Sequence, residues 1–234
     1  MALPKLETPT YELQLPSTGE KIKYRPFLVK EQKLLMVAQE SNDQTQVVNT
    51  VSNLVNSCTF NKVNASTSPV FDIEYLFLQI RGKSVGETVE VNITCPDDEK
   101  TRVPVKINLS DIFVQITDDH TNVVKLTDEI SIHLRYPLLN DLGGVEKMSE
   151  SETVFKLLNT CVHEIHYGDT VYHRTDMSDK ELTEFIDQLT TSQFEKVMVF
   201  FNTMPKLRHP ITVTNPNTKK KSEVILEGLQ SFLE

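Results

Sequence analysis

Alternating apolar and polar positions predict antiparallel hairpins at three places along the chain. The first lies in residues 11–29, the second in residues 88–109 and the third in residues 209–229, and a proline-containing turn interrupts each of them. Successive side chains of a strand point to opposite faces, so each run indicates one apolar and one polar face. Residues 125–139 also have the pattern of extended chain. These segments supply the sheets of the predicted fold.

Apolar residues spaced by three and four positions predict helices between these segments. The helices are expected to begin near residues 29, 44, 69, 149, 178 and 192. Ser68 is suited to cap the third helix, with Pro69 in its first position and an end near Gly82. In the last three helices a serine is followed three residues later by glutamate, which indicates capping boxes at Ser149, Ser178 and Ser192.

The order of these elements recurs in the two halves of the chain. Three matched pairs occur in the same order, namely KYRPFLVKE with HLRYPLLND, LVNSCTFNKV with LLNTCVHEIH, and VEVNITCP with ITVTNP. A duplicated unit usually packs against its copy and hides faces that one copy could not bury. We therefore predict an α+β fold of two pseudo-repeated units, each with helices and an antiparallel β-hairpin. They would span residues 1–116 and 123–234, packed as one compact body. The alternative is two unrelated α+β halves.

The charge of the chain narrows the classes of partner. Acidic residues outnumber basic ones by 33 to 24, giving a net charge of −9, which argues against binding to nucleic acid or to an anionic membrane. No apolar run approaches the ~20 residues that span a bilayer, and the N-terminus lacks a signal-peptide core. Three scattered cysteines favour a reducing compartment over a disulfide framework. We expect a soluble, cytoplasmic protein that binds neither nucleic acid nor membrane.

Motifs of catalysis are missing from the sequence. There is no Gly-x-Ser-x-Gly elbow, and Cys58 and Cys161 lie on apolar helix faces, as small core residues do. Cys161 is followed by His163, His166 and His173, a cluster that raises the question of a metal site. However, the cluster has neither HExxH nor CxxC spacing and runs into a loop. We therefore expect a non-enzymatic protein with no catalytic residue, cofactor, metal or small-molecule substrate.

Two long segments carry a family resemblance. They are LPKLETPTYELQLPSTGEKIKYRPFLVKEQKLLMVAQES and DMSDKELTEFIDQLTTSQFEKVMVFFNTMPKLRHPITV with the closing VILEGLQSFLE. Together they resemble the small baseplate hub subunits and hub assembly proteins of T4-like contractile-tailed phages, most distinctively at Pro26-Phe27-Leu28. The resemblance implies a late protein that acts as a chaperone of tail assembly in the cytoplasm of the infected host. Its partners would be other hub or tail proteins. The alternatives are a permanent subunit of the virion baseplate hub and a tail-associated peptidoglycan hydrolase.

The resemblance also implies a feature that this chain has lost. Relatives often carry a Cys-x-x-Cys pair in each hairpin, similar to a zinc-ribbon knuckle. Here Cys95 stands alone in one hairpin, and residues 215–218 occupy the place of the other pair. A single thiolate cannot complete a tetrahedral zinc site, so none is expected.

Partner binding is expected at the start of the first helix. The candidate residues are Pro26, Phe27, Leu28, Lys30 and Glu31, because an apolar segment there precedes a charged helix. The alternative is that this segment is plain core, as is expected for Leu34, Leu35 and Ala38 on one helix face. At the other end of the chain, Leu229, Phe232 and Leu233 are expected to close the core.

Overall fold

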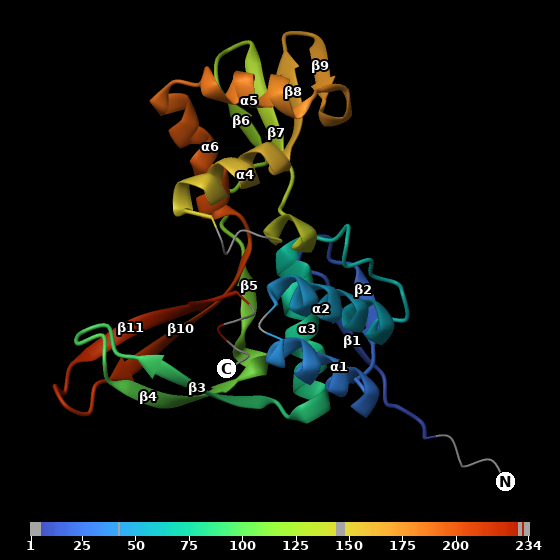
Figure 1. The fold of residues 1–234 in the computed structure, drawn as a ribbon, viewed down its shortest axis with the longest axis vertical. Coiled ribbons are helices and arrows are strands. Elements are labelled where there is room, and N and C mark those ends of the chain that lie inside the picture. The colour runs from blue at the N-terminus through green and yellow to red at the C-terminus, as the bar shows by residue number, and fades with distance from the viewer. Residues whose placement is uncertain (1–5, 42, 144–147, 229–230, 232–234) are drawn as a thin grey trace. The chain divides into compact units, whose positions relative to one another are not determined.

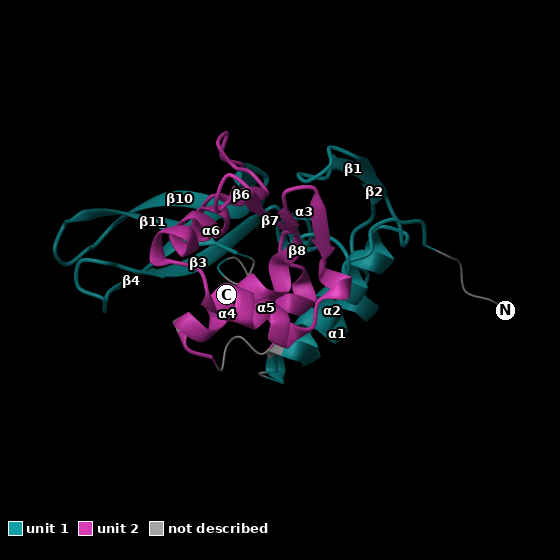
Figure 2. Cartoon of the chain, turned by 90° about the horizontal axis from the view of Figure 1, so that it is seen from above, with its two compact units in different colours: residues 1–115, 206–234 teal, residues 116–205 magenta. Residues whose placement is uncertain are grey.

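The computed structural model describes residues 6–41, 43–143, 148–228 and 231, and the α+β prediction is confirmed (Figure 1). The chain forms two compact units, one of residues 1–115 with 206–234 and one of residues 116–205 (Figure 2). The hairpin of residues 206–227 thus belongs with the first part of the chain, whereas the predicted repeats assign it to the second half. Leu229, Phe232 and Leu233 lie outside the described residues.

The first unit, unit 1, combines three helices with three small antiparallel sheets. Its elements are β1 (Tyr11–Gln14), β2 (Lys21–Tyr24), α1 (Val29–Glu40), α2 (Gln44–Cys58), α3 (Val70–Val85), β3 (Thr88–Thr94), β4 (Arg102–Asn108), β5 (Phe113–Gln115), β10 (Lys206–Thr214) and β11 (Lys221–Glu227). The sheets are β1-β2, β3-β4 and β11-β10-β5, so all three predicted hairpins are present.

Helix α3 lies at the centre of unit 1. Its Ile73, Leu76, Phe77 and Ile80 are fully buried, as expected for a helix that is apolar around most of its circumference. Leu78 of the same helix joins a second apolar cluster formed by the inward faces of β3, β4, β10 and β11. Helix α2 and both long hairpins of unit 1 therefore pack against α3, and α1 packs against α2.

The second unit, unit 2, is a four-stranded antiparallel sheet with three helices. Its elements are β6 (Val123–Lys125), β7 (Ile130–Leu134), α4 (Glu150–Cys161), β8 (Val162–Tyr167), β9 (Thr170–His173), α5 (Asp179–Asp187) and α6 (Thr191–Thr203). The strand order is β6-β7-β8-β9. One core cluster joins the sheet to the helices through residues such as Ile132, Leu158, Leu182 and Phe200. This unit thus has a complete core of its own.

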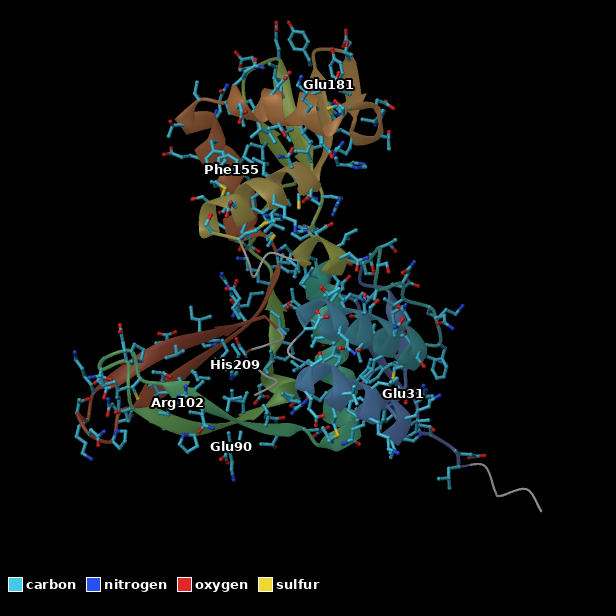
Figure 3. All side chains as sticks on the ribbon, viewed as in Figure 1. Glu31, Glu90, Arg102, Phe155, Glu181 and His209 are labelled. Carbon is cyan, nitrogen blue, oxygen red and sulfur yellow. The ribbon has the colours of Figure 1, made fainter. Side chains whose placement is uncertain are left out.

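Several predicted helix ends are confirmed and three are wrong. Ser149 and Ser178 form capping boxes at α4 and α5, the latter with Glu181 in the first turn (Figure 3). The box of α6 is Thr190 with Gln193, two residues before the predicted Ser192, because the threonine hydroxyl accepts the Gln193 N–H and the Gln193 side chain accepts the Thr190 N–H. At α3 the cap position is Pro69, since the Ser68 hydroxyl donates instead to the Asn64 carbonyl. Helix α3 also continues past Gly82 to Val85.

Candidate docking site

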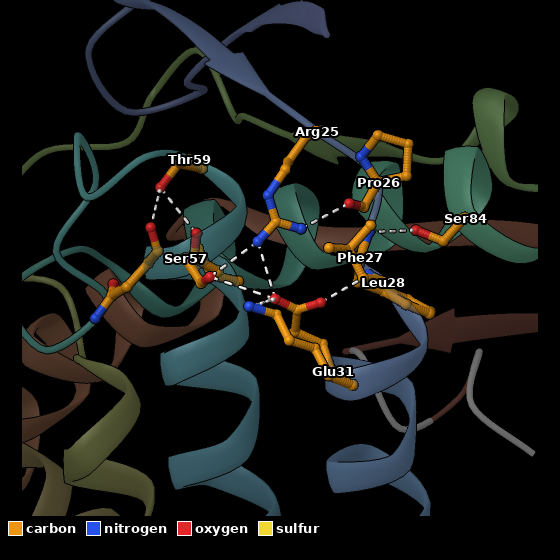
Figure 4. A network of polar contacts seen from close by, with 11 residues as sticks. Arg25, Pro26, Phe27, Leu28, Glu31, Ser57, Thr59 and Ser84 are labelled. Atoms are coloured by element: carbon orange, nitrogen blue, oxygen red, sulfur yellow. Dashed lines mark hydrogen bonds and ion pairs between the residues drawn. The ribbon is translucent and has the colours of Figure 1, made fainter. Parts of the chain in front are cut away.

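A polar network fixes the segment that precedes α1 (Figure 4). The Arg25 guanidinium donates to Glu31 Oε1 at 2.9 Å and to the Pro26 carbonyl at 2.9 Å. The second oxygen of Glu31 accepts the Leu28 N–H at 2.7 Å. Arg25 also donates to Ser57 Oγ at 3.0 Å, which ties the segment to α2. We call Arg25, Glu31 and the Leu28 N–H the Arg25 clamp.

The clamp is an ion pair almost withdrawn from water. The Arg25 and Glu31 side chains are 12% and 7% exposed. Burial on its own raises the pKa of Glu31, but the hydrogen bonds from Arg25 and from the Leu28 N–H outweigh it and leave this pKa lowered. Glu31 is therefore ionised and bound at neutral pH, and its role is to position the start of α1.

The predicted partner-binding residues divide into buried and exposed ones. Pro26, Phe27 and Glu31 are buried, and the Phe27 N–H donates to Ser84 Oγ of α3 at 2.9 Å. Leu28, by contrast, is 40% exposed, and the Lys30 side chain is 71% exposed although its Nζ lies 3.6 Å from Glu31 Oε1. Only Leu28 and Lys30 of the five are thus available to a partner.

The outward side of α1 exposes several large apolar residues among charged ones. Glu31, Leu35 and Ala38 face the core, as predicted for the last two. Leu34 was expected with them, but it lies on the outside, where four apolar side chains of one helix are more than half exposed: Val29 at 67%, Leu34 at 62%, Met36 at 52% and Val37 at 56%. A helix that is apolar on both faces usually has a partner on each, and sequence periodicity alone could have raised this possibility. We call Leu28, Val29, Leu34, Met36 and Val37 the α1 outer face.

A second clamp occurs at the matching place in unit 2. The Arg135 guanidinium donates to Asp141 Oδ2 at 2.7 Å and to the Tyr136 carbonyl at 3.0 Å, and the Leu138 N–H donates to Asp141 Oδ2 at 2.8 Å. The backbone N–H groups of Arg25 and Arg135 donate to the carbonyls of Cys58 and Cys161. These are the positions that the sequence comparison aligned. The pseudo-repeat stays a prediction, and the paired clamps support it.

Hydrogen bonds between side chains join the tips of the two long hairpins in unit 1. Asn215 Nδ2 donates to Asp97 Oδ1 at 2.9 Å, and the Thr218 hydroxyl donates to the other oxygen of Asp97. Asn217 Nδ2 donates to Thr101 Oγ1 at 3.0 Å. Both oxygens of Asp97 therefore accept hydrogen bonds. Burial raises the pKa of the nearby Cys95 thiol, which stays protonated. These residues do not fit a zinc knuckle, because they offer one protonated thiol and a carboxylate that is already bound.

The other two thiols are core residues, as predicted. Cys58 and Cys161 are fully buried. Burial raises the pKa of Cys58 to about 11 and that of Cys161 to about 12, so both stay protonated at neutral pH. Since the thiolate is the reactive form, neither has the character of a catalytic nucleophile.

The histidines after Cys161 lie on strands. His163 and His166 belong to strand β8, and His173 belongs to β9. His133 of β7 joins His166 and Glu164, although some thirty positions separate it from them in the sequence. Local spacing could not reveal this cluster, because strand pairing brings its members together.

The most conspicuous surface of the fold is therefore an exposed apolar helix face, which is typical of proteins that dock onto other proteins. The family model of the T4 bacteriophage base plate protein matches residues 8–234, so the chain belongs to that family. The resemblance found in the sequence is confirmed at this level. No curated protein and no solved structure matches the chain. Within the described residues, no helix is long and apolar enough to cross a membrane.

Proposed function

We propose that this chain is a non-enzymatic assembly protein of the baseplate hub, which binds other hub or tail proteins in the cytoplasm of the infected host during tail morphogenesis. Membership of the base plate family supports a structural role next to other baseplate proteins. The observation that carries the proposal is the α1 outer face, where apolar side chains remain in water although the opposite face of the helix is already packed.

The chemistry of this face defines the partner surface. Covering an exposed side chain of valine, leucine or methionine contributes about 1.5–3 kcal/mol when burial is complete, and several such residues lie on one helix. Lys30 and Lys33 lie among the exposed apolar residues of α1. The partner that fits is therefore a baseplate protein with an apolar groove and acidic residues at its rim, in the helix-in-groove manner. The Arg25 clamp supports such docking because it fixes the first turn of the helix in advance.

The test is co-purification with the other hub proteins of the same phage. The double variant Leu34→Ser with Met36→Ser removes apolar surface without entering the core, and it is expected to lose the bound hub proteins. Ile225→Ser on β11 is the matched control, because Ile225 is 57% exposed but lies outside α1. Equal retention of the hub proteins by both variants would contradict the proposal.

The variant Phe27→Ala distinguishes partner binding by Phe27 from a role of Phe27 in the core. Phe27 is only 8% exposed, so its truncation is expected to cost about 3–5 kcal/mol of stability, as for other buried aromatic residues. Thermal unfolding measures this directly. A Phe27→Ala protein that unfolds at the normal temperature but no longer binds hub proteins would place the docking site at Phe27 and not on the outer face.

A further inference from the structure

The strand pairing of unit 2 points to a metal site that the assembly role does not require. We propose that His133, Glu164 and His166, with His173 as a fourth ligand, bind a divalent transition-metal ion of the type of Zn²⁺. The ion would tie the edge strand β9 to β8 and β7. This proposal reverses our expectation from the sequence that the chain binds no metal.

The sheet register places the four side chains on one face. His133 of β7 pairs directly with Glu164 of β8, and Glu164 pairs with His173 of β9, so these three form a row across three strands. His166 lies two residues along β8 from Glu164 and therefore points to the same face. Directly opposite residues in antiparallel strands have Cβ atoms only about 4.5–5.5 Å apart. Four potential ligands are thus held by backbone pairing and not by mobile loops.

The polar atoms of these side chains already lie close together. His166 Nε2 lies 2.8 Å from Glu164 Oε2, and His173 Nδ1 lies 3.1 Å from Glu164 Oε1. One ligand atom from each of His133, Glu164 and His166 can be chosen so that all three lie within 4.8 Å of one another. Ligands around a tetrahedral zinc ion are separated by about 3.3 Å, given bond lengths of about 2.0–2.1 Å. Binding therefore requires side-chain rotation, which the intermediate burial of these three residues allows.

The imidazole rings surround the carboxylate of Glu164. The rings of His133 and His166 stack with centroids 3.9 Å apart and planes 7° apart, so one ring has to turn before both can direct a nitrogen at one ion. Glu164 supplies one negative charge among the imidazoles.

The chemistry of the donors selects the class of ion. Three imidazoles and one carboxylate suit Zn²⁺, Ni²⁺, Co²⁺ or Cu²⁺, whereas Mg²⁺ and Ca²⁺ prefer sets made only of oxygen ligands. All four residues of β9 are exposed, and the strand pairs with β8 alone. A metal ligand on β9 would hold this edge where packing does not.

The experiment titrates the full chain, freed of metal with chelator, with ZnCl₂ in a calorimeter and with CoCl₂ in a spectrophotometer. We expect saturation at a single ion per chain. The cobalt complex should show visible d–d bands without a thiolate-to-metal charge-transfer band. Glu164→Gln and His133→Ala should each weaken binding by about ten-fold or more, at least as much as the loss of outer-shell partners commonly costs.

Matched controls place the site. His209→Ala removes a half-buried histidine from β10 in unit 1 (Figure 3), and Cys95→Ser removes the lone hairpin thiol; both should bind zinc as the parent does. Thermal unfolding in chelator shows that each variant is folded. Absence of saturable binding, full binding by Glu164→Gln, or loss of binding in Cys95→Ser would overturn the site.

The proposed role of the ion as a clip that holds β9 to β8 and β7 can be measured separately. Zinc should slow hydrogen exchange of the β9 amides, residues 170–173, in the parent chain and not in Glu164→Gln. Zinc binding that leaves this exchange unchanged would overturn the role as a clip.

Discussion

At the scale of single residues, Arg25 and Glu31 of the Arg25 clamp are expected to contribute more to stability than any exposed charge. A buried ion pair is costly to break, because the remaining partner is left charged and without water. Pairs on the surface contribute little, since both groups are already solvated. Glu31 pairs with Arg25 at 7% exposure, whereas Glu12 pairs with Lys23 at 56% exposure. The chain therefore holds a buried Arg–Glu pair and an exposed Lys–Glu pair.

This contrast gives a stability prediction. Glu31→Gln should lower the free energy of unfolding by about 3 kcal/mol, because it leaves the Arg25 guanidinium buried and uncompensated. Glu12→Gln should change it by less than about 0.5 kcal/mol. Urea unfolding of both variants at neutral pH measures the difference. Equal losses of stability in the two variants would contradict the burial of the Arg25–Glu31 pair.

The same carboxylate predicts a dependence on pH. The pKa of Glu31 is lowered in the folded chain from its ordinary 4.5, so the unfolded state binds the proton more readily. The stabilisation by Glu31 is therefore complete above pH 4.5 and is lost as the pH falls through the lower folded value. The gap in stability between the parent and Glu31→Gln should shrink as the pH is lowered from 7 to about 3. A gap that grows on acidification would have the wrong sign.

At the scale of elements, local signals in the sequence predicted most helices and hairpins. The capping boxes at Ser149 and Ser178 depend on contacts within four residues, and such contacts are visible in the sequence. Contacts with residues distant in the sequence decide two other features. These are the side of α1 on which Leu34 lies and the formation of strand β8 directly after α4. For the same reason the predicted partner-binding residues include Phe27, whose burial depends on long-range packing.

The joined tips of the hairpins β3-β4 and β10-β11 give a prediction at this scale. Asn215 is 1% exposed, and its side chain bonds both to Asp97 and to its own turn. Asn215→Ala should lower the free energy of unfolding by about 1–3 kcal/mol, because buried partners lose their hydrogen bonds. Asn92→Ala, at an exposed position of β3, is the control and should be nearly neutral. Denaturant unfolding separates the two; equal stability would mean that the tips are not held by these bonds.

At the scale of the whole molecule, unit 2 is an insertion between two neighbouring strands of unit 1. Gln115 of β5 pairs with Lys206 of β10, and unit 2 spans the residues between them. The chain thus leaves unit 1 and re-enters it at adjacent positions, as inserted domains commonly do. Sequence periodicity could not show this, because the return of residues 206–227 to unit 1 is a long-range pairing.

This topology predicts that the units can be separated. Residues 116–205 should fold alone, since their core cluster draws on no residue outside them. Replacing them by an Asn-Gly turn should leave unit 1 folded, because the turn joins two strands that are already antiparallel neighbours. Circular dichroism and cooperative thermal unfolding of both proteins provide the check. A fragment 116–205 that stays unfolded would show that unit 2 depends on the rest of the chain.

We propose that this base plate family protein binds other baseplate proteins through the α1 outer face. The most direct measurement places a photo-crosslinking amino acid at Met36, or at Ile225 as control, and irradiates cells during phage assembly. Mass spectrometry then identifies the crosslinked chains. We predict a baseplate protein crosslinked from position 36 and not from position 225. No crosslink to a baseplate protein from position 36, or the same products from both positions, would contradict the claim.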